Sequence, residues 1–139
     1  MLISERNVIR MRIPFPTIND KLAVQSHMYI CNKSLGRNHE FVKCQTLKPY
    51  MLQNNTMVHY WDEKPDILRN PFTKPTRIDC DKIFFTLQVV YERQLLTTLR
   101  DDVTEDVMLN VRRELSLGET QAHSLNEKEL VLLNRLIHF

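Results

Sequence analysis

The sequence predicts a mainly β protein of the α+β class, a small barrel or curled sheet with helices packed on it. The chain has 139 residues, 42% of them hydrophobic and 26% charged, which suits one domain with one modest core. Segments of alternating polarity fill the first part of the chain, and helical periodicity with capping signals fills the last. We therefore expect one domain over 1–139, with a barrel over 1–99 and a helical back over 102–139.

Four segments have the composition and alternation that are typical of strands. They are residues 8–15, 27–31, 40–47 and 76–87. The polar residues 17–26 predict a loop, and Gly36 predicts a turn. The segment 48–75 contains four prolines and predicts a long ordered loop, which in a compact domain is usually functional. Residues 57–61 and 95–99 are candidates for further short strands.

Two helices are expected at the end of the chain. Asp102 and Glu105 have the spacing of a capping box, and Gly118 has the position of a helix terminator. The apolar residues between them fall on one helical face: Val103, Val107, Met108, Val111 and Leu115. Ser124 and Glu127 form a second capping box, which predicts a C-terminal helix over 124–139.

Charge is distributed unevenly along the chain. Residues 1–84 carry 13 Lys and Arg against 8 Asp and Glu, whereas residues 85–139 carry 6 against 9. The first part therefore has a net charge of +5 and the second −3. A charge asymmetry of this kind favours a polyanionic partner, such as a nucleic acid, for the basic part. The alternative is an accidental imbalance of surface charge.

The cysteines and the N-terminus indicate a reducing compartment. Cys31, Cys44 and Cys80 are odd in number and lack C-x-x-C spacing, so we expect buried thiols, not a disulfide framework or a zinc site. Charged residues interrupt the apolar N-terminus, which is unlike a signal peptide. No segment approaches the roughly 20 apolar residues of a membrane span. The expected location is therefore cytoplasmic, without membrane contact.

The sequence contains no glycine-rich nucleotide motif, no G-x-S-x-G and no histidines with metal-ligand spacing, so we expect neither cofactor nor metal. A polar set remains at the predicted strand ends. Its residue types suit metal-free phosphoryl transfer, which needs a base, an acid and cations. Each residue also has a structural alternative, such as an ion pair within the fold. The set is His27, Lys43, Thr46, Arg77, Asp79 and Asp81.

The order of four motifs resembles the MazF/PemK (Kid) family of type II toxins. The first is RIPFPT at 12–17, followed by a polar loop and the strand HMYICN at 27–32. VKCQTL at 42–47 and RIDCDKI at 77–83 are similar to two later strands of the family, and LRDDVTE at 99–105 to the run into its helix. The resemblance covers roughly residues 8–117 and consists in the order and spacing of short motifs.

This resemblance implies an SH3-like or CcdB-like barrel that forms a homodimer. It also implies sequence-specific cleavage of single-stranded RNA without a metal, leaving 2′,3′-cyclic phosphate and 5′-hydroxyl ends. An antitoxin with an acidic segment would block the site. Thr46 matches the family's catalytic threonine and Asp81 its aspartate. Ser26-His27 stands where the family has Arg-Pro, so the catalytic arginine is missing, and the helix at 124–139 exceeds the family's usual length.

The expected catalytic residues are His27, as the base, with Thr46 and Asp81. The residues expected to bind RNA are Arg12, Lys43, Arg77 and Trp61. Aromatic residues of the long loop are expected either to stack on bases or to anchor that loop on the barrel: Tyr60, Trp61 and Phe72.

Three functions stay open. The first is an endoribonuclease toxin. The second is a non-catalytic binding module on the same barrel, either a degenerate RNA binder or a protein-targeting toxin like CcdB. The third is an unrelated regulatory barrel.

Overall fold

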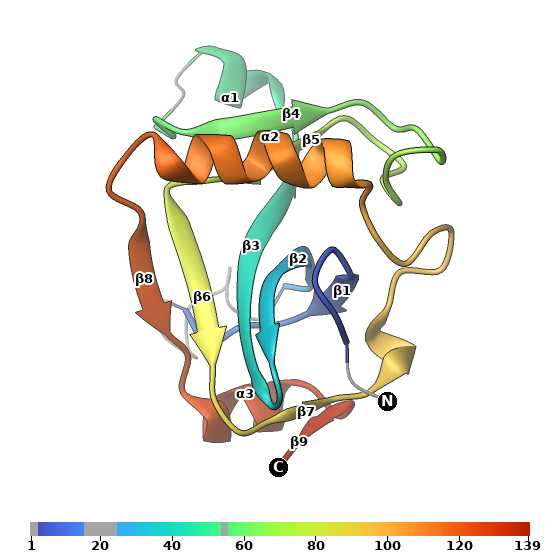
Figure 1. Cartoon of the computed structure of the whole chain (residues 1–139), viewed down its shortest axis with the longest axis vertical. Coiled ribbons are helices and arrows are strands. Elements are labelled where there is room, and N and C mark those ends of the chain that lie inside the picture. The colour runs from blue at the N-terminus through green and yellow to red at the C-terminus, as the bar shows by residue number, and fades with distance from the viewer. Residues whose placement is uncertain (1–2, 16–24, 54–55) are drawn as a thin grey trace.

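One large sheet organises the chain, and short helices surround it (Figure 1). The computed structural model describes residues 3–15, 25–53 and 56–139. Within them, seven strands form the large sheet: β1 (Val8–Met11), β2 (His27–Leu35), β3 (Asn38–Thr46), β4 (Tyr60–Glu63), β5 (Thr76–Asp79), β6 (Lys82–Thr86) and β8 (Gln121–Ser124). β7 (Val90–Tyr91) and β9 (Ile137–His138) pair separately. The α+β, mainly β class is confirmed.

The helices of the described residues are α1 (Pro49–Gln53), α2 (Glu105–Ser116) and α3 (Glu127–Leu133), with the 3-10 helix η1 (Arg93–Leu95). None of these helices is long and apolar enough to cross a membrane. The predicted apolar face of the first C-terminal helix is confirmed, because Val107, Met108 and Val111 of α2 are buried.

The strand β3 is the centre of the sheet. Its antiparallel partners are β2 on one side and, on the other, both β6 and β5. His39–Phe41 pairs with β6 and Cys44–Thr46 with β5, because the chain leaves the sheet at Cys80 and Asp81 between those strands. β1 and β4 extend the sheet beyond β2 and β5, and β8 adds to β6 in parallel. The described strands do not close into a barrel.

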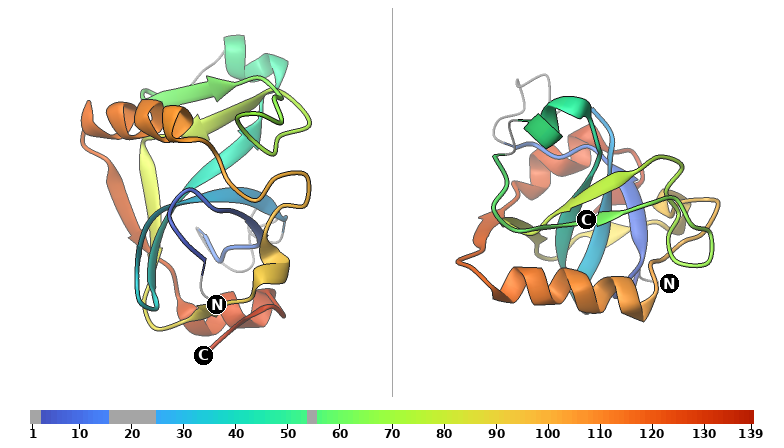
Figure 2. Two further views of the ribbon diagram at one scale, coloured as in Figure 1. Left: turned by 45° about the vertical axis from the view of Figure 1, so that its right-hand side comes forward. Right: turned by 90° about the horizontal axis from the view of Figure 1, so that it is seen from above.

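Both faces of the central strands are buried. The face toward α2 carries Val8, Ile30, Val42, Cys44 and Ile78, which pack with the apolar side of that helix. The opposite face, called the inner face below, carries Ile9, Tyr29, Phe41 and Phe84, which pack with Leu125, Leu130 and Ile137. Figure 2 shows α2 and α3 on different sides of the sheet. Cys31, Cys44 and Cys80 are buried free thiols, as predicted.

The prediction of one continuous helix over 124–139 is wrong. The chain first adds residues 121–124 to β6 as the strand β8, which pairs backbone groups at that sheet edge. Ser124 therefore lies in a strand, and Asn126 caps α3 by accepting a hydrogen bond from the Glu129 amide at 3.1 Å. After α3 the chain forms β9 against β7.

Two other boundaries differ from the predictions. α2 begins after Thr104, and Asp102 accepts a hydrogen bond from Arg100 instead of capping the helix. Within the predicted long loop lie α1 and β4, and β4 covers 60–63 instead of 57–61. At 95–99 there is no strand among the described residues, although Leu96 forms an isolated bridge with Ile9. Most of the predicted loop at 17–26 lies outside the described residues.

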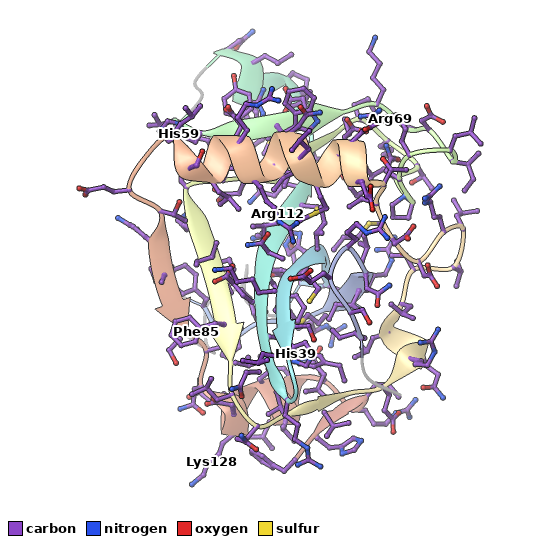
Figure 3. All side chains as sticks on the ribbon, viewed as in Figure 1. His39, His59, Arg69, Phe85, Arg112 and Lys128 are labelled. Atoms are coloured by element: carbon purple, nitrogen blue, oxygen red, sulfur yellow. The ribbon has the colours of Figure 1, made fainter. Side chains whose placement is uncertain are left out.

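The two glycines serve different purposes. Gly36 has a φ of 62° in the β2–β3 turn, the left-handed conformation that glycine adopts without strain. Gly118 follows α2 and does not adopt that conformation. A Cβ atom at this position would overlap with Nε2 of the His59 ring. Figure 3 shows His59 beside the C-terminal end of α2. Gly118 is therefore explained by close packing rather than by helix termination.

Gly118→Ala is expected to destabilise the protein by about 1 kcal/mol, because the His59 ring must move to admit the methyl group. In a His59→Ala background the same change should stabilise by about 0.5 kcal/mol, since alanine restricts the unfolded chain more than glycine does. Urea unfolding of the four proteins in this double-mutant cycle measures both values. An equal effect of Gly118→Ala in both backgrounds would contradict the packing explanation.

Candidate functional site

The predicted site residues divide between two cavities. A cavity of about 240 Å³, called the His27 cavity, is lined by Arg10, Ser26, His27, Thr46, Thr73 and Lys74 among others. A cavity of about 520 Å³, called the Asp79 cavity, is lined by Gln45, Tyr50, Asp79, Asp81, Lys82 and Gln121 among others. Neighbouring residues of β3, Gln45 and Thr46, contribute to different cavities because side chains alternate across a strand.

The antiparallel register of the sheet builds the His27 cavity. Met28 pairs with Cys44, so the first residue of β2 lies beside the last residues of β3. His27 and Thr46 thereby line one cavity although 18 residues lie between them in the sequence. Arg10 pairs with Met28 in β1 and contributes a cation, and Lys74 contributes another from the segment before β5.

Cations and hydroxyl groups dominate the polar lining of the His27 cavity. Arg10 and Lys74 are exposed, and neither forms an ion pair with any described residue. Hydroxyl groups lining the same cavity come from Ser26, Thr46, Thr73 and Thr76. No carboxylate is among the described lining residues. Guanidinium, ammonium and hydroxyl groups together are the donors that proteins use to bind phosphate.

The imidazole of His27 is neutral at physiological pH. Burial, and secondly the positive charge of Lys43, lower the pKa of His27 to about 4. A neutral imidazole can accept a proton, as a general base must. Its Nε2 atom is buried and has no hydrogen-bond partner in the described part of the chain. The pKa of Lys43 is itself lowered by burial and by the charge of Lys82, while Asp79 acts in the opposite direction.

Asp81 lies in the Asp79 cavity, away from His27 and Thr46. One carboxylate oxygen accepts a hydrogen bond from the Val58 amide at 2.8 Å, and the other accepts one from the His59 amide at 2.9 Å. Asp81 therefore holds the segment that leads into β4. The structure does not bring the three predicted catalytic residues together.

Arg77 is committed to contacts within the protein. Its Nε and Nη2 donate to the two carboxylate oxygens of Asp62, both at 2.8 Å, and its Nη1 donates to the Met51 carbonyl at 3.3 Å. The guanidinium carbon lies 3.9 Å from the centre of the Tyr60 ring, and the side chain is 3% exposed. Hydrogen bonding to Asp62 raises the pKa of Arg77. These contacts favour the structural alternative for this cation.

The other predicted RNA-binding residues are scattered. Trp61 packs on the α2 face and donates to Glu63 at 2.9 Å, while Phe72 is buried in the same cluster. With Tyr60 beneath Arg77, the aromatic residues have the positions expected of loop anchors. Arg12 is exposed, and its backbone binds the Asn134 side chain beside α3. Lys43 is half-buried on the inner face.

Sequence reasoning missed Arg10 and Lys74 as cations of the His27 cavity. The signal that could have found Arg10 is the strand register, which follows only when the pairing of β1 and β2 is known. Sequence reasoning also missed Gln45 and Gln121 in the Asp79 cavity. Gln121 was missed because the strand β8 was not predicted. Among the described residues, no three His, Cys, Asp or Glu side chains are placed to hold a metal ion.

Comparison with known proteins does not assign the chain to a family. No protein-family model matches the sequence, and no curated protein matches it significantly. The likeness to the MazF/PemK toxins therefore stays a prediction from the order of short motifs.

Proposed function

We propose that this protein is a toxin of the MazF/PemK type that cleaves single-stranded RNA without a metal at the His27 cavity. The observation that carries the proposal is that His27 and Thr46 line one cavity together with Arg10 and Lys74, two cations that form no ion pair with any described residue. A neutral histidine, a hydroxyl group and cations are the groups that phosphoryl transfer within an RNA strand needs.

In the proposed reaction, the His27 imidazole accepts the proton of a ribose 2′-hydroxyl. The 2′-oxygen then bonds to the adjacent phosphorus, and the bond from phosphorus to the 5′-oxygen of the next nucleotide breaks. That oxygen leaves as a hydroxyl with a proton from solvent, and the other product ends in a 2′,3′-cyclic phosphate. Arg10 and Lys74 neutralise the charge on the non-bridging oxygens, to which Thr46 donates a hydrogen bond.

The proposal extends to the fold and the partners of the toxin. The curled antiparallel arrangement around β3 is consistent with an open variant of the SH3-like or CcdB-like barrel. A homodimer and a cognate antitoxin complete the proposal. An acidic segment of the antitoxin would compete with RNA for Arg10 and Lys74, because both cations are exposed.

A second candidate is a non-catalytic module that binds RNA or a protein target. Two observations favour it. Asp81, which matches the family's aspartate, is occupied by the backbone amides of Val58 and His59. The Nε2 atom of His27 is buried. In this alternative the cations of the His27 cavity bind phosphate groups, and no bond in the RNA is broken.

Incubating the purified protein with single-stranded RNA in EDTA separates the two candidates. The proposal expects cleavage, with 2′,3′-cyclic phosphate and 5′-hydroxyl ends detected by end-group analysis. RNA binding without cleavage would support the non-catalytic module, and absence of both would contradict both candidates.

Replacing both Arg10 and Lys74 by alanine is expected to weaken RNA binding and its dependence on salt. For single strands, each lost phosphate contact reduces the magnitude of the slope of log K against log salt by about 0.7. The slope of the double variant should therefore be smaller in magnitude by about 1.4. Fluorescence anisotropy at several salt concentrations measures this slope. Lys128→Ala on α3, which does not line the cavity, is the control and should leave the slope unchanged. An unchanged slope in the double variant would place RNA elsewhere.

A further inference from the structure

The Asp79 cavity is a polar feature that the proposed function leaves unused. Side chains from neighbouring strands line it: Gln45 of β3, Asp79 of β5, Lys82 of β6 and Gln121 of β8. Tyr50 and Met51 of α1 line it as well. With about 520 Å³ of space, the cavity lies in the size range of sites for small organic ligands.

Carboxylates outnumber free cations in this cavity. Asp79, Asp81 and Glu119 line it, against Lys82 and Arg77. Asp62 already neutralises Arg77 through two hydrogen bonds. An excess of negative charge disfavours phosphate and favours a ligand that donates hydrogen bonds. The cavity therefore differs in kind from the His27 cavity, whose described polar lining is cationic and hydroxylic.

Asp79 is a buried carboxylate with acceptor positions left over. It is 3% exposed, one of its oxygens accepts a hydrogen bond from the Asp81 amide at 2.8 Å, and the Lys82 amide also donates to the carboxylate. The Lys82 ammonium lies 3.9 Å from the other oxygen, too far for a hydrogen bond. A carboxylate has about four acceptor positions, so it can receive further donors from a ligand. Burial raises the pKa of Asp79, and such donors would offset that cost.

We propose that the Asp79 cavity binds a planar heterocycle with two adjacent N–H donors, as on the guanine base of a nucleoside. The ring N–H and the neighbouring amino group of guanine donate to the carboxylate of Asp79. The Gln45 and Gln121 amides each offer a donor and an acceptor to the remaining edge. The Tyr50 ring and the Met51 side chain offer the apolar surface that a flat base covers. This binding does not depend on RNA cleavage at the His27 cavity.

Titration of the full chain with guanosine, followed by amide NMR shifts, tests the inference. Guanosine is expected to bind at least 10-fold more tightly than inosine, which lacks the amino group, and to shift the amides of Asp79 and Gln121. Guanosine monophosphate should bind no more tightly than guanosine. Tighter binding of the monophosphate, or equal binding of inosine, would overturn the assignment.

Asp79→Asn keeps an acceptor for the Asp81 amide, so the fold should persist. It is expected to weaken guanosine binding by about 10- to 100-fold, the loss typical of a hydrogen bond to a charged group. Asp101→Asn, which removes an exposed carboxylate outside the cavity, is the matched control and should bind as the parent does. Gln45→Ala, which leaves Asp79 intact, should weaken binding less. Equal affinity of Asp79→Asn and Asp101→Asn would contradict the inference.

Discussion

Replacement of Glu63 by alanine is expected to reduce the free energy of unfolding by about 3 kcal/mol. The Glu63 side chain is 6% exposed, at the end of β4. Arg69 donates two hydrogen bonds to its carboxylate, both at 3.1 Å, and Trp61 and Asn70 each donate one at 2.9 Å. Without the carboxylate, the Trp61 N–H loses its acceptor, and the buried Asn70 amide keeps only the Lys64 carbonyl of its two acceptors. Figure 3 shows Arg69 near the N-terminal end of α2.

Thermal unfolding measures this effect, with an expected fall in Tm of roughly 10 °C. Glu63→Gln keeps an acceptor but not the charge, so about half of the loss is expected. Glu119→Ala, at an exposed position, is the control and should change the Tm by less than about 2 °C. A Tm for Glu63→Ala equal to that of the control would show that the network contributes nothing to stability.

The same network predicts how stability depends on pH. Burial raises the pKa of Glu63, but hydrogen bonds from Arg69, Trp61 and Asn70 outweigh burial and leave this pKa lowered. The ionised Glu63 therefore contributes its full stabilisation of the fold above the pKa it has in the unfolded chain, near about 4.3. This stabilisation is lost as the pH falls through the lower pKa of Glu63 in the folded protein. Glu63→Gln should lack this part of the acid dependence.

The strands were predictable because their alternation is local, whereas the C-terminal elements were not. Residues 40–47 alternate clearly, and β3 covers nearly the same range. Residues 121–124 carry no such pattern, and they form β8 only because β6 offers an unpaired edge. Whether that edge is unpaired depends on the order of all the strands, which local sequence does not reveal. The only local signal was the capping box at Ser124, and this capping box does not form, because Asn126 caps α3 instead.

The site was predictable only in part, for a related reason. His27 and Thr46 line one cavity because β2 begins beside the end of β3, an arrangement that the order of the strands suggests. The roles of Arg77 and Asp81 depend instead on partners within the predicted long loop, namely Asp62 of β4 and the Val58 amide before β4. Residue type shows that an arginine can bind phosphate, but not whether another carboxylate already holds it.

His27→Ala is expected to lower kcat/KM for RNA cleavage by about 10²- to 10⁴-fold at pH 7, the usual contribution of a general base. His138→Ala, at an exposed position of β9, is the control and should cleave as the parent does. Initial rates on a short single-stranded RNA in EDTA give the comparison, with circular dichroism to show that both variants fold. A His27→Ala rate within threefold of the control would remove His27 from the mechanism.

The pH dependence of cleavage tests the assignment independently of the alanine variant. The base acts in its neutral form, and the pKa of His27 is about 4, so kcat/KM should be constant above about pH 5. It should fall as the pH drops through 4. A fall centred near 6.5 instead would indicate a solvent-exposed histidine as the base. Profiles from pH 3.5 to 8 distinguish the two, with circular dichroism at each pH to show that the protein remains folded.

Lys43→Met separates two roles of that cation. If the Lys43 charge helps to lower the pKa of His27, its removal should move the acid limb of the pH profile to higher pH. The limb should not reach 6.5, because His27 stays buried. If Lys43 only binds phosphate, KM should rise while the limb stays in place. The inner-face position of Lys43, on the other side of the sheet from Thr46, favours the first result. A higher KM with an unmoved limb would mean that RNA reaches the inner face.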